Sequence, residues 1–509
     1  MQHHTIRTQF ATVKRKTLLV VFCGGINLIL IQWVLVRELT ALLLGTELVV
    51  LLVSISYFAG LSLGYGLSGR VRRSWLIPIA VVTLVMHLSL PIWFRLLVVA
   101  LNAIYAYPLA FVILPLLTPF VVSAPYSIFL PLLVDSGEGS LRTLYAIELI
   151  GSALGVLTLV LLGGVGIQAV YVVYSACVLV LLWALRGDDV GARHVLPLPY
   201  VIPLAILCAA WLVVLPMVNM WSNALWYVEL RGLPEGTLTL FTGYSPYQKV
   251  DVLEAPDGSR YLYLDGLQHY DPGEGSRLNV LMGSVPGFLV RPPNALVIGA
   301  GSMEMARFIA YYAGHVTTVE IDPMVIDASV RYFDAVNWMS RLTNRTIIVD
   351  DARHYIANTD ERYDFVATDT PAAFTIQTAT LYSEPFFAQV AERLNPGGVF
   401  VVNLTSNFAP DDLVSRRIAA GLLVHFNEVV VITSGSAGWS FAYASDDLPF
   451  DRAALETTLQ NNDETAYALF ETPAVRAIVG DAQPITLDSM DIVLQISADY
   501  LRGRLGLDD

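Results

Sequence analysis

Residues 296–301 read Leu-Val-Ile-Gly-Ala-Gly, an apolar strand that ends in glycines, and Glu320 closes the next apolar run of the chain. Glycines after a strand let the backbone approach a ligand closely. An acid at the tip of the following strand can accept hydrogen bonds from both hydroxyls of a ribose. Together the two features predict a nucleoside-binding fold in this part of the chain.

Apolar strand runs alternate with helical stretches on both sides of this unit. The runs cover 295–299, 315–321, 346–350, 364–368, 399–404 and 428–433. Such alternation predicts a Rossmann-like, methyltransferase-type α/β domain with a mostly parallel sheet. Ligands bind these sheets at the carboxyl ends of the strands. The candidate ligand-binding residues at those ends are Gly299, Gly301, Glu320, Asp351 with Ala352, and Asp369.

The first half of the chain has a different composition. Seven stretches are apolar and long enough to cross a bilayer, which takes roughly 20 helical residues. They cover 17–36, 47–69, 75–98, 107–134, 143–163, 168–185 and 197–218, and the fourth contains several prolines. We expect four parts: a multi-pass membrane domain (1–221), a small β unit (222–285), the Rossmann-like domain (286–450) and a helical C-terminal extension (451–509).

The charges divide at the same place. Residues 1–221 hold 12 Lys and Arg against 7 Asp and Glu, and residues 222–509 hold 18 against 37, so the formal charges are +5 and −19. An acidic globular half makes nucleic acid an unsuitable partner, since phosphate binding needs basic surface. Cationic ligands such as amines suit it better. No spacing of His, Cys, Asp or Glu typical of a metal site occurs.

The basic residues also bear on which side of the cell membrane the globular half occupies. If the N-terminus is cytoplasmic, ten Lys and Arg fall in inside loops and only Arg37 falls outside. This asymmetry favours a cytoplasmic N-terminus. Seven spans then place the globular half outside the cytoplasm, whereas the supply of adenosyl compounds argues for the cytoplasm. The sequence leaves the side open, with the fourth span as the one most open to miscounting.

Charged residues inside the apolar stretches are few: Arg37-Glu38, His87, Arg95 and Glu148. An ionisable group within a bilayer costs about 2.5–3.5 kcal/mol or more, so a functional role is one interpretation. The other interpretation is that these residues pair with each other or lie near the span ends.

With these residues in order, residues 225–445 resemble the spermidine synthase (polyamine aminopropyltransferase) family. The matching elements are Tyr247-Gln248, Leu264-Asp265-Gly266-x-Gln268, the glycine loop at 297–301, Val319-Glu320-Ile321-Asp322, Asp351-Ala352, Tyr363-Asp364 through Asp369, and Leu381-Tyr382-Ser383-Glu384. Multi-pass membrane forms of the family also occur, in agreement with the first half.

The resemblance implies transfer of an aminopropyl group from decarboxylated S-adenosylmethionine, as co-substrate, to an amine such as putrescine. Methylthioadenosine is released, and no cofactor is bound permanently. Asp369 would be the catalytic base, Gln248 and Glu320 would hold the nucleoside, and Asp351 with Ala352 the adenine. The expected partners are a small amine and the lipid bilayer, with a homodimer as a further expectation.

Three amine-binding elements of the family are altered here. Thr370-Pro371-Ala372 follows Asp369 without a second aspartate, Arg277-Leu278-Asn279 stands where the family has Tyr-His-Glu, and Ser302-Met303-Glu304 replaces Asp-Gly-Gly. Asp271, Glu274, Glu304 and Glu384 are candidate substitutes. Two alternatives follow: a methyltransferase-like enzyme with another acceptor, or a non-catalytic nucleoside-binding membrane protein.

Overall fold

The computed structural model describes residues 14–43, 45–104, 107–185, 198–299, 301–368, 370–434, 439–462, 467–488 and 491–505. The chain forms two compact units. The first comprises Met1–Leu43, Val49–Leu233 and Gly243–Gln248, and the second comprises Leu44–Leu48, Pro234–Thr242 and Lys249–Asp509. We refer to them as the helical unit and the globular unit.

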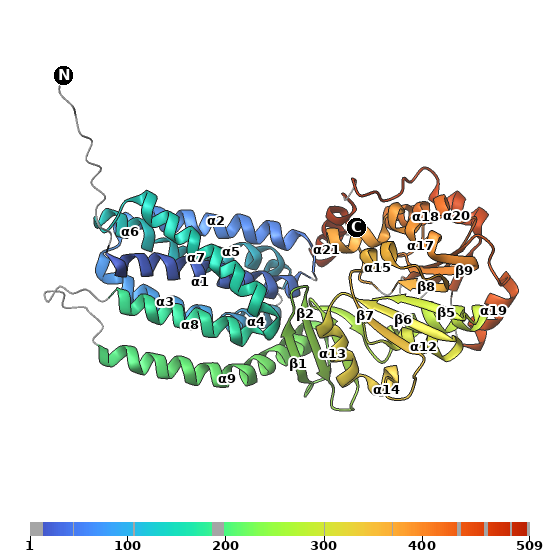
Figure 1. The fold of residues 1–509 in the computed structure, drawn as a ribbon, viewed down its shortest axis with the longest axis horizontal. Coiled ribbons are helices and arrows are strands. Elements are labelled where there is room, and N and C mark those ends of the chain that lie inside the picture. The colour runs from blue at the N-terminus through green and yellow to red at the C-terminus, as the bar shows by residue number, and fades with distance from the viewer. Residues whose placement is uncertain are drawn as a thin grey trace, which may run out of the picture. The chain divides into compact units, whose positions relative to one another are not determined.

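The helical unit consists of long apolar helices that run side by side (Figure 1). Their bounds are α1 Arg15–Leu42, α2 Leu48–Leu67, α3 Leu76–Leu88, α4 Leu90–Ala103, α5 Tyr107–Ser127, α6 Phe129–Asp135, α7 Leu141–Leu162, α8 Ile167–Ala184 and α9 Leu198–Arg231. Helix α9 therefore continues through Trp221, the expected end of the membrane domain.

Among the described residues, six helices are long and apolar enough to cross a membrane, and a seventh span results if α3 and α4 are counted as one. These two helices are bent by 66° at Ser89. Pro91 lies in the first turn of α4, where a missing N–H favours a helix start and not a continuation. The strong bend thus falls in the third expected span, whereas the fourth is divided at Ile128 into α5 and α6 without such a bend.

Small residues spaced as in Gly60-x-x-x-Gly64 and Gly151-x-x-x-Gly155 let helices approach closely. A β-carbon added at Gly151 would lie 2.2 Å from the carbonyl oxygen of Phe22 in α1. One added at Gly60 would lie 2.3 Å from that of Phe120 in α5. Both glycines therefore lie at close helix contacts.

The globular unit begins with the small antiparallel sheet that the sequence predicts, with strand order β1-β2-β3-β4. The strands are β1 Leu238–Tyr244, β2 Lys249–Glu254, β3 Arg260–Leu264 and β4 Leu267–Tyr270. Asp265 and Gly266 connect β3 to β4, with φ values of 48° and 74°. Asp-Gly is the favoured pair for such a two-residue hairpin.

An eight-stranded sheet of order β12-β10-β11-β9-β8-β5-β6-β7 forms the centre of the globular unit (Figure 1). Its strands are β5 Asn294–Ile298, β6 His315–Glu320, β7 Arg345–Val349, β8 Tyr363–Thr368, β9 Leu394–Asn403, β10 Glu428–Ser434, β11 Ser440–Ser445 and β12 Tyr467–Phe470. Strands β5 to β9 are parallel, which confirms the predicted Rossmann-like core.

The remaining edge of the sheet is antiparallel and was not predicted. Strand β11 pairs with both β9 and β10, and β12 pairs with β10. Strand β12 lies in the part of the chain for which the sequence predicts only helices (451–509). Its four residues are too few to produce a period-2 signal.

Helices cover both faces of this sheet, and buried side chains form one core on each face. The helices are α10 Glu274–Asn279, α11 Val285–Val290, α12 Glu304–Tyr312, α13 Pro323–Tyr332, α14 Asp334–Asn337, α15 Ala352–Asn358, α16 Ile376–Ala379, α17 Glu384–Arg393, α18 Leu413–His425, α19 Arg452–Asn461, α20 Thr472–Val479 and α21 Asp491–Leu505. Central strands buried on both faces read as continuous apolar runs, as β8 does at Phe365, Val366 and Ala367.

Candidate nucleoside and amine site

The glycine turn after β5 has the conformation that its glycines allow. Gly299 and Gly301 have φ values of 91° and 45°, in the region that disfavours L side chains. The Gly299 N–H donates to the carbonyl of Val319 (2.9 Å), which joins the turn to β6. The Ser329 hydroxyl donates to the Gly301 carbonyl from behind. The turn is therefore held in place. Ala300 lies outside the described residues.

Glu320 lies at the end of β6, next to this turn, and its side chain is almost fully buried. Its Oε1 accepts from the Asp322 N–H (2.8 Å), which fixes the carboxylate orientation. Its own carbonyl accepts from the Asp350 N–H (3.1 Å), which ties the end of β6 to the end of β7. The structure thus places the glycine turn, Glu320 and Asp350 at one edge of the sheet, as predicted.

Asp351 begins α15 as its N-cap. One carboxylate oxygen accepts from the N–H groups of Arg353 (2.8 Å) and His354 (3.3 Å), and the other lies 3.5 Å from the Arg353 guanidinium. Ala352 is the first residue of the helix. A carboxylate has about four acceptor sites, so capping does not exhaust it. The adenine role of this pair stays a prediction.

The catalytic candidate Asp369 lies outside the described residues, directly after β8. The residues that follow it in the chain form several hydrogen bonds. The Tyr382 hydroxyl is shared between the carbonyls of Thr370 and Pro371 (both 3.1 Å), and Tyr382 is buried. The Phe374 carbonyl accepts from the Glu47 N–H (3.1 Å). The segment after the candidate base therefore has defined contacts.

Gln248, the remaining candidate for the nucleoside, groups with the helical unit. Its backbone closes a turn with Ser245: the Ser245 N–H donates to the Gln248 carbonyl (2.9 Å), and the Gln248 N–H donates to the Ser245 hydroxyl (2.9 Å).

Glu304 is the best placed of the candidate amine-binding acids. It lies in the first turn of α12, only 4% exposed, after Met303 with a φ of 61°. Its carboxylate accepts from the Ser276 hydroxyl (2.9 Å) and the Asn279 amide (3.1 Å) of α10. The Arg307 guanidinium is 3.3 Å away. Burial raises the pKa of Glu304 against the opposing effect of these partners.

Asp271 belongs to the same acidic region. Its negative charge contributes to the raised pKa of Glu304, so the two carboxylates interact. It accepts from the Gln268 amide (2.5 Å) and the Gly273 N–H (2.7 Å). Glu384 is instead bonded to His425 between α17 and α18. Nothing is described of the Glu274 side chain.

The sequence did not single out Ser276, and it treated Asn279 only as a lost family acid. Their three-residue spacing places both on one face of a helix, which is the signal that could have identified them.

A cavity of about 370 Å³ occurs elsewhere in the globular unit, lined by Asn294, His315, Thr346, Tyr355 and Tyr363 among others. It lies toward the amino ends of the parallel strands, opposite the edge where such sheets bind ligands.

The sheet, the glycine turn and the acid at the adjacent strand end are features of an α/β domain of the methyltransferase type. Residues 278–450 match the family model described as "Spermine/spermidine synthase domain". This part of the chain is similar to the spermidine synthase family, a family of transferases.

The curated relatives support the same family. A polyamine aminopropyltransferase of Thermoplasma acidophilum is 29% identical over 212 residues, 39% of this chain and 75% of that protein. Polyamine aminopropyltransferase 1 of Aquifex aeolicus is 25% identical over 244 residues, covering 46% and 86%. Putrescine N-methyltransferase 2 of Nicotiana attenuata is 29% identical over 203 residues, covering 39% and 54%.

A crystal structure of spermidine synthase in complex with the transition-state analogue AdoDATO is also similar, with 20% identity and a TM-score of 0.39 over 53% of this chain and 88% of that chain.

Proposed function

We propose that the protein transfers an aminopropyl group from decarboxylated S-adenosylmethionine to an amine acceptor such as putrescine. The observation that carries this proposal is the edge shared by the glycine turn, Glu320 and Asp350, together with the buried acid Glu304 in the first turn of the helix that follows the glycine turn. The first group suits a nucleoside, and the second suits an ammonium group of the donor or acceptor.

The reaction requires an uncharged acceptor nitrogen. Its lone pair attacks the methylene carbon beside the sulfonium, the carbon–sulfur bond breaks, and the bonding electrons stay on sulfur as neutral methylthioadenosine. A carboxylate within hydrogen-bond reach takes the proton that the acceptor nitrogen loses. We assign this role to Asp369, while the acids hold the other charges and align the attack.

Methyl transfer from S-adenosylmethionine is a second candidate function. One observation favours it: Arg307 accompanies Glu304 at 3.3 Å, so the site offers both signs of charge. The intact donor carries an ammonium and a carboxylate, whereas the decarboxylated donor carries only the ammonium. The putrescine N-methyltransferase relatives point in the same direction.

Two measurements on the full chain test these proposals. Calorimetry with methylthioadenosine, decarboxylated S-adenosylmethionine and S-adenosylmethionine should show nucleoside binding and a preference for the decarboxylated donor. Asp369→Asn should retain nucleoside binding and lose transfer to putrescine. Preference for S-adenosylmethionine would favour methyl transfer. An absence of binding by all three compounds would favour a non-catalytic protein that recognises something else.

We further propose that the helical unit spans the cell membrane, because its helices have the length and hydropathy that a bilayer requires. Fractionation of cells, followed by carbonate washing of the membranes, should leave the protein in the pellet.

A further inference from the structure

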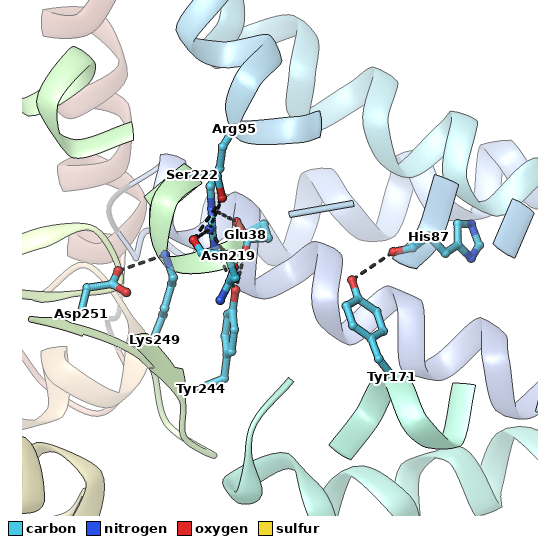
Figure 2. A network of polar contacts seen from close by, with 9 residues as sticks. All are labelled: Glu38, His87, Arg95, Tyr171, Asn219, Ser222, Tyr244, Lys249 and Asp251. Carbon is cyan, nitrogen blue, oxygen red and sulfur yellow. Dashed lines mark hydrogen bonds and ion pairs between the residues drawn. The ribbon is translucent and has the colours of Figure 1, made fainter. Parts of the chain in front are cut away.

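Carboxylate, guanidinium and imidazole side chains are rare in the interior of the helical unit. In its described part the buried ones are Glu38, His87, Arg95 and Glu148. Glu38 of α1 and Arg95 of α4 form a two-pronged ion pair, with Nε–Oε2 at 3.0 Å and Nη2–Oε1 at 2.8 Å (Figure 2). The Tyr244 hydroxyl also donates to Glu38. Each charge of this pair therefore offsets the cost of burying the other.

His87 of α3 also has partners within the unit. Its two ring nitrogens lie 2.6 Å from the Tyr174 hydroxyl and 3.0 Å from the Val122 carbonyl oxygen. Its backbone carbonyl accepts from the Tyr171 hydroxyl (3.0 Å; Figure 2). The imidazole thus has a hydrogen-bond partner at each nitrogen, as buried polar groups usually have.

Glu148 of α7 differs from these three residues. It is only 6% exposed, and its carboxylate forms no hydrogen bond or ion pair with any residue that the structure describes. It is the eighth residue of α7, about 10 Å from the helix start at 1.5 Å per residue. A charge at such a depth in a bilayer is costly, and acids placed there face substrate or ion pathways. This carboxylate therefore either keeps a proton or receives a cation from outside the chain.

A tyrosine of α2 approaches Glu148 at the surface of α1. Gly25 of α1 packs directly against the Glu148 carbonyl, with no room for a β-carbon between them. The Tyr57 hydroxyl donates to the Leu28 carbonyl of α1 (2.7 Å), and Leu28 lies three residues after Gly25, on the same face of the helix. Tyr57 is also within electrostatic range of the Glu148 carboxylate. One buried aromatic side chain therefore lies beside the unpaired acid.

Two further tyrosines lie on the more exposed side of Glu148. Tyr145 precedes it by three residues, on the same face of α7. Tyr65 of α2 is within electrostatic range of both Glu148 and Tyr145. Tyr65 and Tyr145 are 37% and 47% exposed, so this side of the acid is open at the surface of the helical unit.

A carboxylate among aromatic rings suits an ammonium group. The carboxylate accepts charge-assisted hydrogen bonds from the ammonium N–H groups, and the ring faces attract the cation. A divalent metal ion suits the site less well, because Ca²⁺ and Mg²⁺ take six or more oxygen ligands. In the described part of the chain, no three His, Cys, Asp or Glu side chains are grouped as a metal ion would require.

We propose that Glu148, with Tyr57, Tyr65 and Tyr145, forms a binding site for an alkylammonium ion inside the helical unit. The ligand is a primary amine with an aliphatic chain: the ammonium group meets the carboxylate, and the chain lies against the apolar helices. The helical unit then binds an amine besides its proposed attachment to the membrane. This inference needs only the helical unit and does not rest on the proposed reaction of the globular unit.

Photolabelling of the full chain in lipid nanodiscs tests the site. The probe is a short aliphatic primary amine that carries a diazirine, and the carboxylic acid of equal length is its charge control. After irradiation, mass spectrometry of peptides should find the amine label in α2 and α7. Unlabelled butylamine should compete with this label, and the acid probe should label these peptides much less.

Substitutions then test each group of the site. Glu148→Gln keeps the shape and removes the charge, so the amine concentration for half-maximal labelling of α2 and α7 should rise about 10- to 100-fold. Tyr65→Leu removes a ring from the partly exposed side and should raise it about two- to fivefold. Tyr65→Phe keeps the ring and should behave as the wild type.

Glu138→Gln is the matched control for Glu148→Gln. Glu138 belongs to the same unit, but its carboxylate pairs with Arg73 (2.6 Å) and accepts from the Thr17 hydroxyl (2.7 Å). Its neutralisation should leave labelling of α2 and α7 unchanged. An equal loss in both variants would overturn the proposal, because it would then reflect general loosening of the helices.

Two further outcomes would also overturn the proposal. One is equal labelling of α2 and α7 by the amine and acid probes in the wild type, which would mean that Glu148 only keeps a proton. The other is unchanged labelling in both Glu148→Gln and Tyr65→Leu. The Tyr65 pair of variants decides the matter if Glu148→Gln does not fold. Labels in the globular unit fall on other peptides, so failure of the proposed transferase function is read separately.

Discussion

The Glu320 side chain is buried and its carboxylate is held in one orientation, so a single substitution can test its role in binding. Glu320→Gln keeps the shape and an oxygen for the Asp322 N–H, but it offers one acceptor where a ribose diol needs two. We expect about a 10- to 100-fold loss of methylthioadenosine affinity, the range for a hydrogen bond to a charged group. The melting temperature should change little. Calorimetry and thermal unfolding are the measurements.

Glu361 provides the matched control for this substitution. Its carboxylate accepts from the Tyr363 hydroxyl (2.9 Å) at the amino end of β8, opposite the proposed nucleoside edge. Glu361→Gln should leave the affinity unchanged. Equal losses in both variants would show that any neutralised carboxylate weakens binding, and Glu320 would have no special role.

The raised pKa of Glu304 predicts a pH dependence of donor binding. Its ordinary pKa is 4.5, and burial places the folded value above this. As the pH falls through that raised value, Glu304 takes up a proton and loses its attraction for an ammonium group. The affinity for decarboxylated S-adenosylmethionine should therefore fall at acidic pH more steeply than that for methylthioadenosine, which has no ammonium group. Glu304→Gln should abolish the difference. Parallel pH profiles in the wild type would contradict this role.

For single residues, the sequence predicted the positions of Gly299, Gly301 and Glu320 at the carboxyl ends of strands, because a strand followed by glycines and an acid is a local pattern. It did not predict the partners of Glu304, since Ser276 and Asn279 are distant in the chain and meet it only through packing. Nor did it show that the Asp351 carboxylate is occupied as a helix cap. That depends on where α15 begins, and helix boundaries are uncertain by one or two residues.

At the scale of elements, neighbouring glycines of α1 provide a controlled test of helix packing. A β-carbon at Gly25 would lie 2.1 Å from the carbonyl oxygen of Glu148 in α7, whereas one at Gly24 meets nothing within 4 Å. Gly25→Ala should force the helices apart and destabilise the protein. Gly24→Ala should be neutral or stabilise it by up to about 1 kcal/mol through helix propensity. Thermal unfolding in detergent compares the two, and equal melting temperatures would refute the close contact.

The elements that the sequence predicted well are those with a long apolar run. All six predicted strands of the large sheet are present; five of them, β5 to β9, form its parallel part, where buried strands are continuous apolar runs, and the sixth is β10. Strands β11 and β12 were not predicted, because their pairing with β10 depends on tertiary contacts that no local sequence pattern encodes. The break at Ser89 was missed for a similar reason, since the prolines of the fourth span drew attention and Pro91 alone ended the helix.

At the scale of the whole molecule, the contacts within the helical unit determine how often the chain passes through it. Glu138 joins the connection before α3 to the start of α1. Its carboxylate pairs with Arg73 (2.6 Å) and accepts from the Thr17 hydroxyl (2.7 Å). Arg95 in α4 is joined to Glu38 near the end of α1. Helices α3 and α4 together therefore reach from one end of the helical unit to the other despite their bend, which supports our proposal of a membrane domain and would give seven passes among the described residues.

An odd number of passes places the two ends of the unit on opposite sides of a membrane. The start of α1 shares its end of the unit with Arg73 and with Trp183, which lies under Lys16 at 5.9 Å. Most of the basic residues of this half are at that end, and α9 leaves the opposite end at Arg231. The positive-inside rule predicts that the basic end is cytoplasmic. We therefore expect the globular unit on the non-cytoplasmic side.

Single cysteines test this orientation in intact cells. Asp257→Cys lies in the exposed turn between β2 and β3, and Ser74→Cys lies in the exposed connection before α3. A membrane-impermeant maleimide should label Asp257→Cys in intact cells and Ser74→Cys only after lysis, with the wild type, whose cysteines are in helices, as background. The reverse pattern would place the globular unit in the cytoplasm. The expected pattern would mean that the globular unit meets its nucleoside outside the cytoplasm.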